Sequence, residues 1–190
     1  MREPRSRADA VRNREAVLDA AEALFVREGL AKVSMNSVAA AAGVGKGTVF
    51  RAFTDRTGLL QALAERRTAP LREAVTEGPA PLGPGTPPRE RIPAMLDAAA
   101  RTKLDNLSLY LALEETGSTS PYRLPSYGWW HGTLRDELEK LTDPANAGFL
   151  AHALLAAVRA DLMTHLAAEE ETPGEEIRER LAAYVDAVLP

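Results

Sequence analysis

Cysteine is absent from this chain of 190 residues, and histidine is scarce. Without cysteine the protein can form no disulfide, no thiolate nucleophile and no cysteine zinc site. The three histidines, His131, His152 and His165, are far apart and show no metal-binding spacing such as HExxH. We therefore expect no metal and no cofactor, and we find no constellation of residues that predicts an enzyme.

Long apolar runs are also missing. No uninterrupted run approaches the about 18 residues of a membrane span, and the N-terminal stretch MREPRSRADAVRNRE has no apolar segment typical of a signal peptide. Apolar residues nevertheless make up 45% of the chain, enough for a packed core. These features predict a soluble intracellular protein without a membrane partner.

Charge is distributed unevenly along the sequence. Residues 1–72 carry 13 Lys and Arg against 8 Asp and Glu, a net charge of +5, whereas residues 73–190 carry 10 against 19, a net charge of −9. A basic segment beside an acidic one is typical of a nucleic-acid-binding module attached to a different domain.

Apolar spacing and helix-breaking residues predict an all-α fold of about nine helices without a strand. We expect the helices at about 12–28, 35–42, 46–53, 55–76, 89–104, 106–115, 129–141, 144–170 and 173–189. The helix at 89–104 could instead begin at Ile92, because Pro93 is tolerated only near a helix start. The proline-rich segment 78–88 predicts a flexible loop.

The stretch G-V-G-K-G-T-V-F-R, residues 43–51, allows two interpretations. A nucleotide-binding loop would cradle phosphates with its glycines and lysine, but that motif requires glycine where Ala40 stands and Ser or Thr where Gly47 stands. It also requires a preceding strand, and the residues before Gly43 favour a helix. As the turn of a helix-turn-helix, the same glycines would let the second helix approach DNA phosphates closely.

Two longer stretches of the N-terminal segment are informative together: AVLDAAEALFVREG, followed by VSMNSVAAAAGVGKGTVFRAFTDRTGLL. They resemble the DNA-binding domain of TetR-family transcriptional regulators over roughly residues 12–63. The resemblance implies a three-helix head with a basic N-terminal arm over residues 1–56, and a C-terminal domain over 57–190 for ligand binding and dimerisation. It also implies a cytoplasmic, nucleoid-associated homodimer that binds double-stranded operator DNA.

By position, the resemblance places a set of residues at the DNA: Ser34, Asn36, Lys46, Gly47, Thr48, Phe50, Arg51 and Arg56. Phe50 stands where the family usually has a phosphate-binding tyrosine, so its role is open between DNA contact and partly buried packing. Arg51 is the main candidate for reading bases, since a bidentate contact to guanine is the commonest specific pairing. The arginines before residue 15 are open between a DNA-contacting arm and a solvated tail.

The resemblance further implies a small hydrophobic effector whose binding releases the operator. Apolar and aromatic residues with a few polar tips predict its site: Leu107, Tyr110, Leu111, Tyr127, Trp129, Trp130 and His131. These rings could equally fill the core of the helical domain.

Two apolar stripes on the last two predicted helices suit a two-fold four-helix interface. Their residues are Leu150, Leu154, Val158, Leu162, Leu181, Tyr184, Val185 and Val188. An acidic helical adaptor for other proteins remains an alternative, but it leaves the basic segment unexplained.

Overall fold

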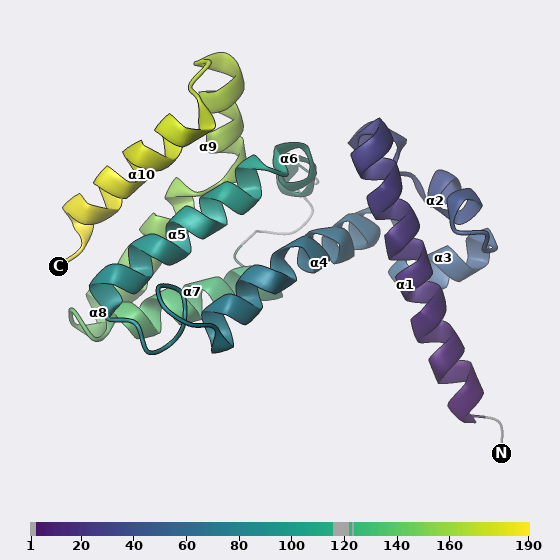
Figure 1. Ribbon diagram of the computed structural model, residues 1–190, viewed down its shortest axis with the longest axis horizontal. Coiled ribbons are helices and arrows are strands. Elements are labelled where there is room, and N and C mark those ends of the chain that lie inside the picture. The colour runs from purple at the N-terminus through teal and green to yellow at the C-terminus, as the bar shows by residue number, and fades with distance from the viewer. Residues whose placement is uncertain (1–2, 116–121, 123) are drawn as a thin grey trace. The chain divides into compact units, whose positions relative to one another are not determined.

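The computed structural model describes residues 3–115, 122 and 124–190, without the side chains of residues 3–8 and 115. Throughout these ranges the regular structure is helical, and they contain no strand, which confirms the all-α prediction (Figure 1). The chain divides into two compact units, Met1–Arg66 and Arg67–Pro190. This division falls later than the boundary expected at residue 56, because Leu59, Leu60 and Leu63 are buried in the first unit.

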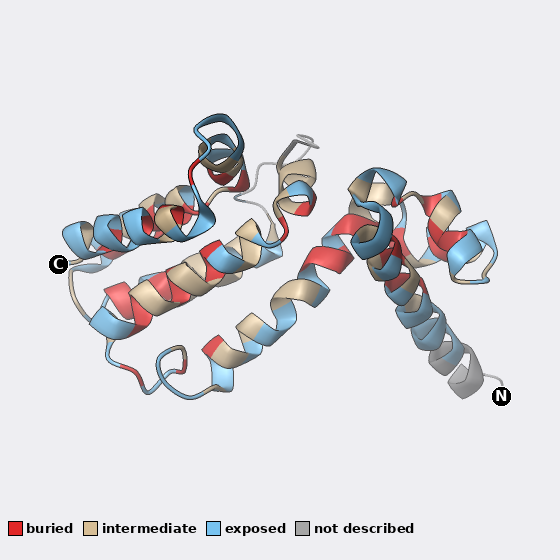
Figure 2. Cartoon of the chain, turned by 45° about the horizontal axis from the view of Figure 1, so that its top comes forward, coloured by how far each residue is buried: buried red, intermediate tan, exposed pale blue. Residues whose placement is uncertain are grey.

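The first unit, which we call the head, begins with α1 (Glu3–Glu28), ended by Gly29 at a φ of 80°. A short turn, η1 (Leu30–Lys32), leads to α2 (Met35–Ala41) and α3 (Lys46–Phe53). The bounds of α2 and α3 agree closely with the predicted 35–42 and 46–53. Apolar residues at helical spacing form the core: Val17, Leu18, Ala21, Leu24, Val38, Val49 and Phe53. Figure 2 shows buried positions on the C-terminal half of α1, away from its N-terminal end.

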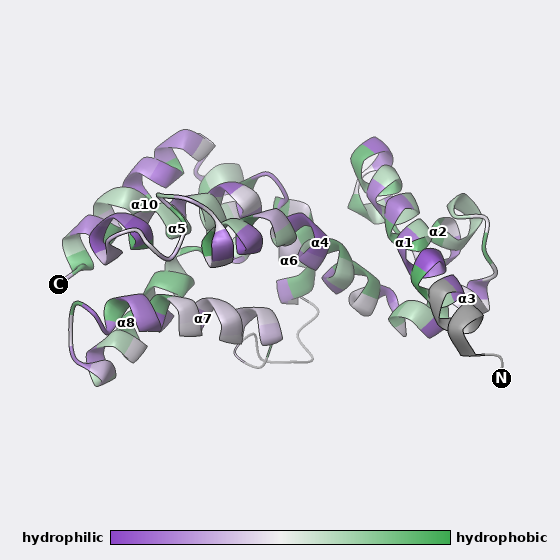
Figure 3. Ribbon diagram, turned by 60° about the horizontal axis from the view of Figure 1, so that its bottom comes forward, coloured by the Kyte–Doolittle hydropathy of each residue, from purple (hydrophilic) through white to green (hydrophobic). Residues whose placement is uncertain are grey.

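The fourth helix, α4 (Arg56–Glu77), starts in the head and ends in the second unit. Its N-terminus is capped by Asp55, whose Oδ1 accepts the backbone N–H of Gly58 at 2.8 Å. Such a cap satisfies one of the N–H groups that the first helical turn leaves without a partner. Hydrophobic and hydrophilic residues are interspersed along the described parts of α1 and α4 (Figure 3).

The second unit continues from α4 through α5 (Pro88–Leu104), α6 (Leu107–Glu115) and α7 (Pro125–Leu138). It ends with α8 (Pro144–Ala157), α9 (Ala160–Thr164), η3 (His165–Glu169) and α10 (Gly174–Val188). Helix α5 begins at Pro88 rather than Ile92, and α7 begins at Pro125 rather than Trp129. In both cases a proline occupies the first helical position, where its missing N–H costs no hydrogen bond.

A buried arginine holds the end of α4, the proline-rich loop and α7 together. The Arg91 guanidinium donates to the carbonyl oxygens of Val75 at 2.6 Å and Leu82 at 2.8 Å and forms an ion pair with Glu137. The Val75 carbonyl would ordinarily accept from the residue four positions later, but that residue is Pro79, which has no N–H. Lys140 also contacts Glu137 at 2.8 Å. The loop at 78–87 is therefore anchored by long-range polar contacts.

The helix predicted over 144–170 is wrong as a single element. It breaks after Val158, where Arg159 has an extended backbone with a ψ of 144°. The carboxylate of Glu114, on α6, accepts the N–H groups of Ala160 at 3.0 Å and Asp161 at 3.1 Å. It also lies 3.3 Å from the guanidinium of Arg159. Glu114 thus supplies the cap that lets a second helix start at the break.

By length and mean hydropathy, the segment Pro144–Glu169 is apolar enough to cross a membrane, although the sequence analysis expected no such run. A core helix of a soluble protein satisfies the same criterion, and a third of the most apolar window is buried inside the second unit. The break at Val158 and Arg159 also divides the segment. We interpret it as core-forming.

Candidate nucleic-acid interface

The turn between α2 and α3 is built around Gly43, which has a φ of 65°, in the left-handed region that favours glycine. Its N–H donates to the Ala40 carbonyl at 3.3 Å, and the N–H of Val44 donates to the Ala39 carbonyl at 3.1 Å. The side chain of Val44 is half-buried in this turn. Because the helix α2 precedes the glycines where a nucleotide-binding loop needs a strand, the turn has the helix-turn-helix arrangement.

The N-terminus of α3 has few side-chain atoms that would block the approach of a ligand. Gly45 is the N-cap residue and provides no side-chain cap. A Cβ placed on Gly45 would meet no heavy atom within 4 Å, and one on Gly47 would meet only Nη2 of Arg51 at 3.9 Å. The first turn of α3 therefore has no side-chain cap and is uncrowded at both glycines, and the helix dipole favours an anion at this end.

The two faces of α3 differ sharply in burial. Val49 and Phe53 are buried in the head, whereas Lys46, Gly47, Phe50 and Arg51 are exposed and Thr48 is half-buried. The Nε of Arg51 donates to the Gly47 carbonyl at 3.2 Å, so the guanidinium lies along the outer surface of the helix. The exposed set includes most of the residues that the sequence analysis assigned to DNA on this helix.

Ser34 and Asn36, at the start of α2, have different surroundings. The Oγ of Ser34 accepts the N–H of Ser37 at 3.1 Å, while the N–H of Ser34 donates to Oγ of Ser37 at 3.0 Å. This capping box occupies the Ser34 side chain within the head. Asn36 is exposed and points outward from the helix surface.

Arg56, which the sequence analysis assigned to the DNA backbone, is bound inside the head. Its Nε donates to the Val33 carbonyl at 2.9 Å and its Nη2 to the Leu30 carbonyl at 3.2 Å. A guanidinium held by two backbone carbonyls of the η1 region orients the start of α4 against that turn. Arg56 is therefore a positioning residue in this structure.

The expected basic arm is different in the structure, because helix α1 begins at Glu3 and includes the positions of Arg12 and Arg14. Arg2 and the side chains of Arg5 and Arg7 lie outside the described residues. Nη1 of Arg14 donates to the Ala52 carbonyl at 2.8 Å, and its guanidinium lies 4.4 Å from the centre of the Phe53 ring. Arg14 thus satisfies a carbonyl at the C-terminal end of α3, where helices lack intrahelical donors. Sequence reasoning missed this contact because 38 residues separate the partners.

The predicted effector residues in the second unit are divided between two groups. On α6, the hydroxyl of Tyr110 lies 2.9 Å from that of Thr68, and burial raises the pKa of this phenol. Leu107 and Leu111 are half-buried on the same helix. On α7, Trp129 and Trp130 contact each other edge to face, with the guanidinium of Arg72 4.8 Å from the Trp129 ring.

Helices α7 and α8 form an antiparallel hairpin that brings Tyr127 and His131 against His152. The rings of the two histidines lie 4.0 Å apart, and the Tyr127 hydroxyl is 2.6 Å from Nδ1 of His152. His131 also contacts the Gly148 carbonyl at 3.2 Å. Burial lowers the pKa of His152, and the neighbouring His131 lowers it further. Sequence reasoning missed the place of His152 in this cluster, because His152 comes from a different helix.

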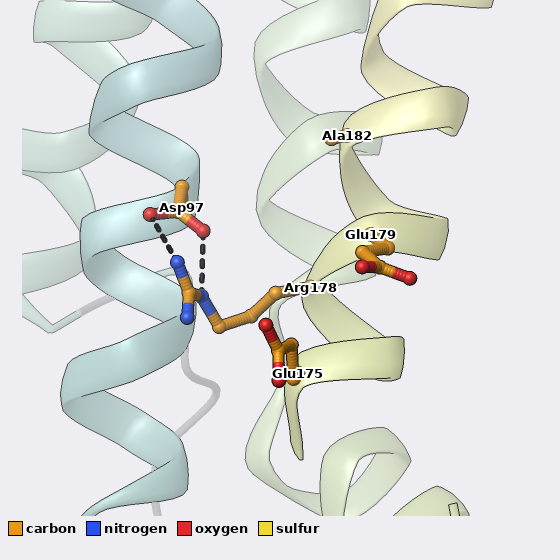
Figure 4. A pocket seen from close by; sticks show the side chains of 5 residues that line it. All are labelled: Asp97, Glu175, Arg178, Glu179 and Ala182. Atoms are coloured by element: carbon orange, nitrogen blue, oxygen red, sulfur yellow. Dashed lines mark hydrogen bonds and ion pairs between the residues drawn. The ribbon is translucent and has the colours of Figure 1, made fainter. Parts of the chain in front are cut away.

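The pocket that the structure describes lies elsewhere, between α5 and α10. It is a recess of about 200 Å³ lined by Asp97, Glu175, Arg178, Glu179 and Ala182 (Figure 4). Arg178 and Asp97 form a bidentate ion pair at 2.6 and 2.9 Å across it. Such a charged lining does not suit the small hydrophobic effector that the sequence analysis expected.

Burial also divides the predicted dimer-interface residues. Leu154, Val158, Leu181 and Val185 belong to the core of the second unit and cannot reach a second copy. Leu162 and Tyr184 are 40% and 39% exposed, and Leu150 and Val188 are half-buried. Phe149, on α8, is 73% exposed. The sequence analysis did not include it, because it lies outside the predicted stripe of leucines.

Comparison with known sequences gives matches in the head. Residues 17–63 match the family model described as bacterial regulatory proteins, tetR family. An HTH-type transcriptional regulator of Staphylococcus aureus strain bovine RF122 / ET3-1 is 42% identical over 53 residues, 28% of this chain and 29% of that protein. One from strain USA300 is 38% identical over 60 residues, 32% of each chain. The match thus spans about a third or less of the length of these curated relatives.

Solved structures resemble nearly the whole chain. A transcriptional regulator of the TetR/AcrR family from Thermobifida fusca has a TM-score of 0.63 at 20% identity, covering 93% of this chain and 98% of that one. The multidrug binding protein EbrR, complexed with imidazole, has a TM-score of 0.62 at 24% identity, covering 93% and 89%. At these identities the likeness shows a shared fold, a helix-turn-helix head followed by a helical second unit.

Proposed function

Because the chain belongs to the TetR family of bacterial regulators through its helix-turn-helix domain, we propose that it is a repressor released from operator DNA by a small effector. In this proposal a homodimer binds a palindromic operator in double-stranded DNA, in the cytoplasm at the nucleoid. The effector is a small hydrophobic molecule that binds the second unit.

The outer surface of α3 is the observation that carries this proposal. Its first turn offers backbone N–H groups without a side-chain cap, and Lys46 and Arg51 extend from the same exposed surface. The segment that contains it, residues 1–72, has a net charge of +5 in a chain whose net charge is −4. A cationic helix with an unobstructed N-terminus is suited to the phosphates and base edges of a major groove.

Each exposed residue has a distinct part in this proposal. The N–H groups near Gly47, together with Lys46 and Thr48, bind phosphates, and Asn36 adds a phosphate contact from the start of α2. Arg51 reaches a guanine, where its planar guanidinium can donate two hydrogen bonds. Ser34 and Arg56 act indirectly, because they hold α2 and the start of α4 in place.

Support for the effector and the dimer comes from the second unit. The half-buried rings of Tyr127, Trp129 and Trp130 pack against its core and could separate to admit an apolar molecule. One structural relative is described as a multidrug binding protein. For the dimer, we propose the exposed surface that includes Phe149, Leu162 and Tyr184, since solvent contacts large apolar side chains there.

A salt titration of operator binding tests the proposal. The purified full chain is incubated with its own promoter region and with a scrambled fragment of equal length, between about 50 and 200 mM salt. Specific binding should weaken steeply as salt rises, because each phosphate contact releases counterions. Binding of both fragments with equal affinity, or affinity that does not change with salt, would contradict DNA recognition by this surface.

Tryptophan fluorescence tests the proposed effector site. A library of small apolar compounds is screened for quenching, and each hit is tested for release of the promoter fragment. Trp129→Phe and Trp130→Phe should change quenching by a true effector. A compound that quenches both tryptophans and leaves DNA binding unchanged would argue against an effector at this site.

A further inference from the structure

Phe50 lies on the outer surface of α3, but the proposed contacts with phosphates and guanine do not explain an apolar ring at this position. Its side chain is 49% exposed, whereas the other two large apolar residues of the helix, Val49 and Phe53, are buried. Packing in the head therefore does not account for the ring. An exposed aromatic ring gains free energy when a partner removes it from water, so its place on the DNA-facing surface indicates a contact there.

The position of the Phe50 ring on α3, beside Gly47 and Arg51, indicates which part of the DNA the ring contacts. Gly47 lies three residues before Phe50 and four before Arg51, so the two side chains stand on either side of a position without a side chain. A Cβ at Gly47 would meet only Arg51, at 3.9 Å. The helix backbone can therefore come close to the DNA at Gly47, and this approach carries both Phe50 and Arg51 toward the base edges of the groove.

The chemistry of the ring limits what it can recognise. Phenylalanine has no donor or acceptor, so it cannot form a hydrogen bond with a phosphate or with a base edge. Thymine is the only base that presents a methyl group in the major groove, and apolar side chains, phenylalanine among them, contact it there.

We propose that Phe50 reads the 5-methyl group of a thymine in each operator half-site, next to the base that Arg51 reads. This inference rests on the proposed function, since it requires that α3 enters the major groove. It assigns sequence discrimination to an apolar contact whose strength does not depend on salt, in contrast to the contacts of Lys46. The recognition helix would then read one position by hydrogen bonds and a neighbouring one by hydrophobic contact.

The test replaces thymine by deoxyuridine, which removes the 5-methyl group and keeps every hydrogen-bonding atom. Binding-site sequencing of fragmented genomic DNA with the full chain first gives the operator. Each thymine of the half-site is then replaced in turn, symmetrically in both halves, and the Kd is measured by fluorescence anisotropy. We expect one position to weaken binding about fourfold per half-site, the loss for one methyl-sized group.

Variants assign that loss to the ring. Phe50→Ala should bind the thymine operator more weakly and should be insensitive to deoxyuridine at the critical position. Phe50→Leu, which keeps an apolar side chain, should retain part of the sensitivity. Val26→Ala, which shortens an apolar residue that is 73% exposed on α1, is the matched control and should behave as the wild type. Unfolding midpoints confirm that each variant is folded.

Several outcomes would overturn the proposal while leaving the proposed function intact. The first outcome is that the wild type binds its operator specifically and that deoxyuridine weakens this binding at no position. A deoxyuridine effect that persists undiminished in Phe50→Ala is another, because a different residue would then contact the methyl group. A third is a gain of affinity for every sequence in Phe50→Tyr, which would place the ring beside a phosphate. Failure of the wild type to bind any promoter fragment would overturn both.

Discussion

The two units of this chain use their polar side chains in opposite ways. In the head, the charged residues of α3 are exposed, and the core is formed by apolar side chains. The buried polar or charged residues among those the structure describes all belong to the second unit: Thr86, Arg91, Asn106, Glu137 and Thr172. The outer surface of α3 thus keeps its charged groups in solvent, whereas the second unit uses buried polar groups to join its own helices.

The difference shows where each unit is vulnerable. Substitutions on the surface of the head should change what it binds and leave its folding intact, because an exposed side chain contributes little to stability. Substitutions in the polar network of the second unit should change folding first, because an unpaired buried charge is costly. The following substitutions test this difference between the head and the second unit.

Removal of Glu137 should give the largest loss. In Glu137→Ala the buried Arg91 guanidinium loses the carboxylate with which it forms an ion pair, and breaking such a pair typically costs about 3–5 kcal/mol. Urea unfolding followed by circular dichroism measures the change. Asp136→Ala, at an exposed neighbouring position, is the control. A loss below about 1 kcal/mol would show that water solvates the guanidinium and that the network is not structural.

Arg51→Ala should affect binding and not folding. We expect a loss of about 1–3 kcal/mol in operator binding, confined to one operator position, since Arg51 is proposed to contact a single base. Arg180→Ala, which removes an exposed arginine of the second unit, is the matched control. Competition binding against operators with single base changes measures the effect. An equal loss on every sequence would make Arg51 a phosphate contact.

Ser34→Ala removes the N-cap of α2 and should destabilise the head by about 1 kcal/mol. The effect is smaller than that of Glu137 because solvent can replace the lost hydrogen bond. Hydrogen exchange at the amide of Ser37, which donates to Ser34, reports it locally. Ser126→Ala, at an exposed position of α7, controls for the loss of a hydroxyl. Unchanged exchange at Ser37 would count against the capping box.

The pH dependence of the second unit should be the smallest effect, because His152 is exposed and solvent screens its charge. The pKa of His152 is lowered in the folded protein, so the unfolded chain binds more protons near its usual pKa. Its contribution to stability is therefore complete at neutral pH and above. It is lost as the pH falls below the ordinary pKa of about 6.5 and through the lower pKa of the folded protein. Unfolding at pH 5 and pH 8 in the wild type and His152→Gln measures it. An equal pH dependence in both proteins would exclude this residue as the cause.

Local features made the head predictable. The bounds of α3, Lys46–Phe53, follow from the glycines before it and from the four-residue spacing of Val49 and Phe53. The cap at Ser34 is likewise set by residues within one turn. Such signals involve neighbours in the sequence, which can be read without knowledge of the fold.

Long-range contacts explain the errors. The break after Val158 depends on Glu114, whose carboxylate reaches the chain from α6. The inward orientation of Arg56 depends on carbonyl groups more than 20 residues earlier. Leu154 and Leu162 belong to one predicted stripe, but the break at Val158 lies between them, so only Leu154 lies in the core. No pattern within the sequence specifies which partners such groups find.

The sequence by itself determined that the protein is helical, that its basic end carries a helix-turn-helix, and that α3 presents Lys46 and Arg51. These outcomes depend on periodicity, caps and charge, which act over a few residues. Only the tertiary structure decided that Arg14 and Arg56 serve the head internally, that Glu114 caps α9, and that Phe50 is exposed. The physical reason is that burial and hydrogen-bond partners are set by packing between distant segments, and a side chain's function depends on which of its groups packing leaves free.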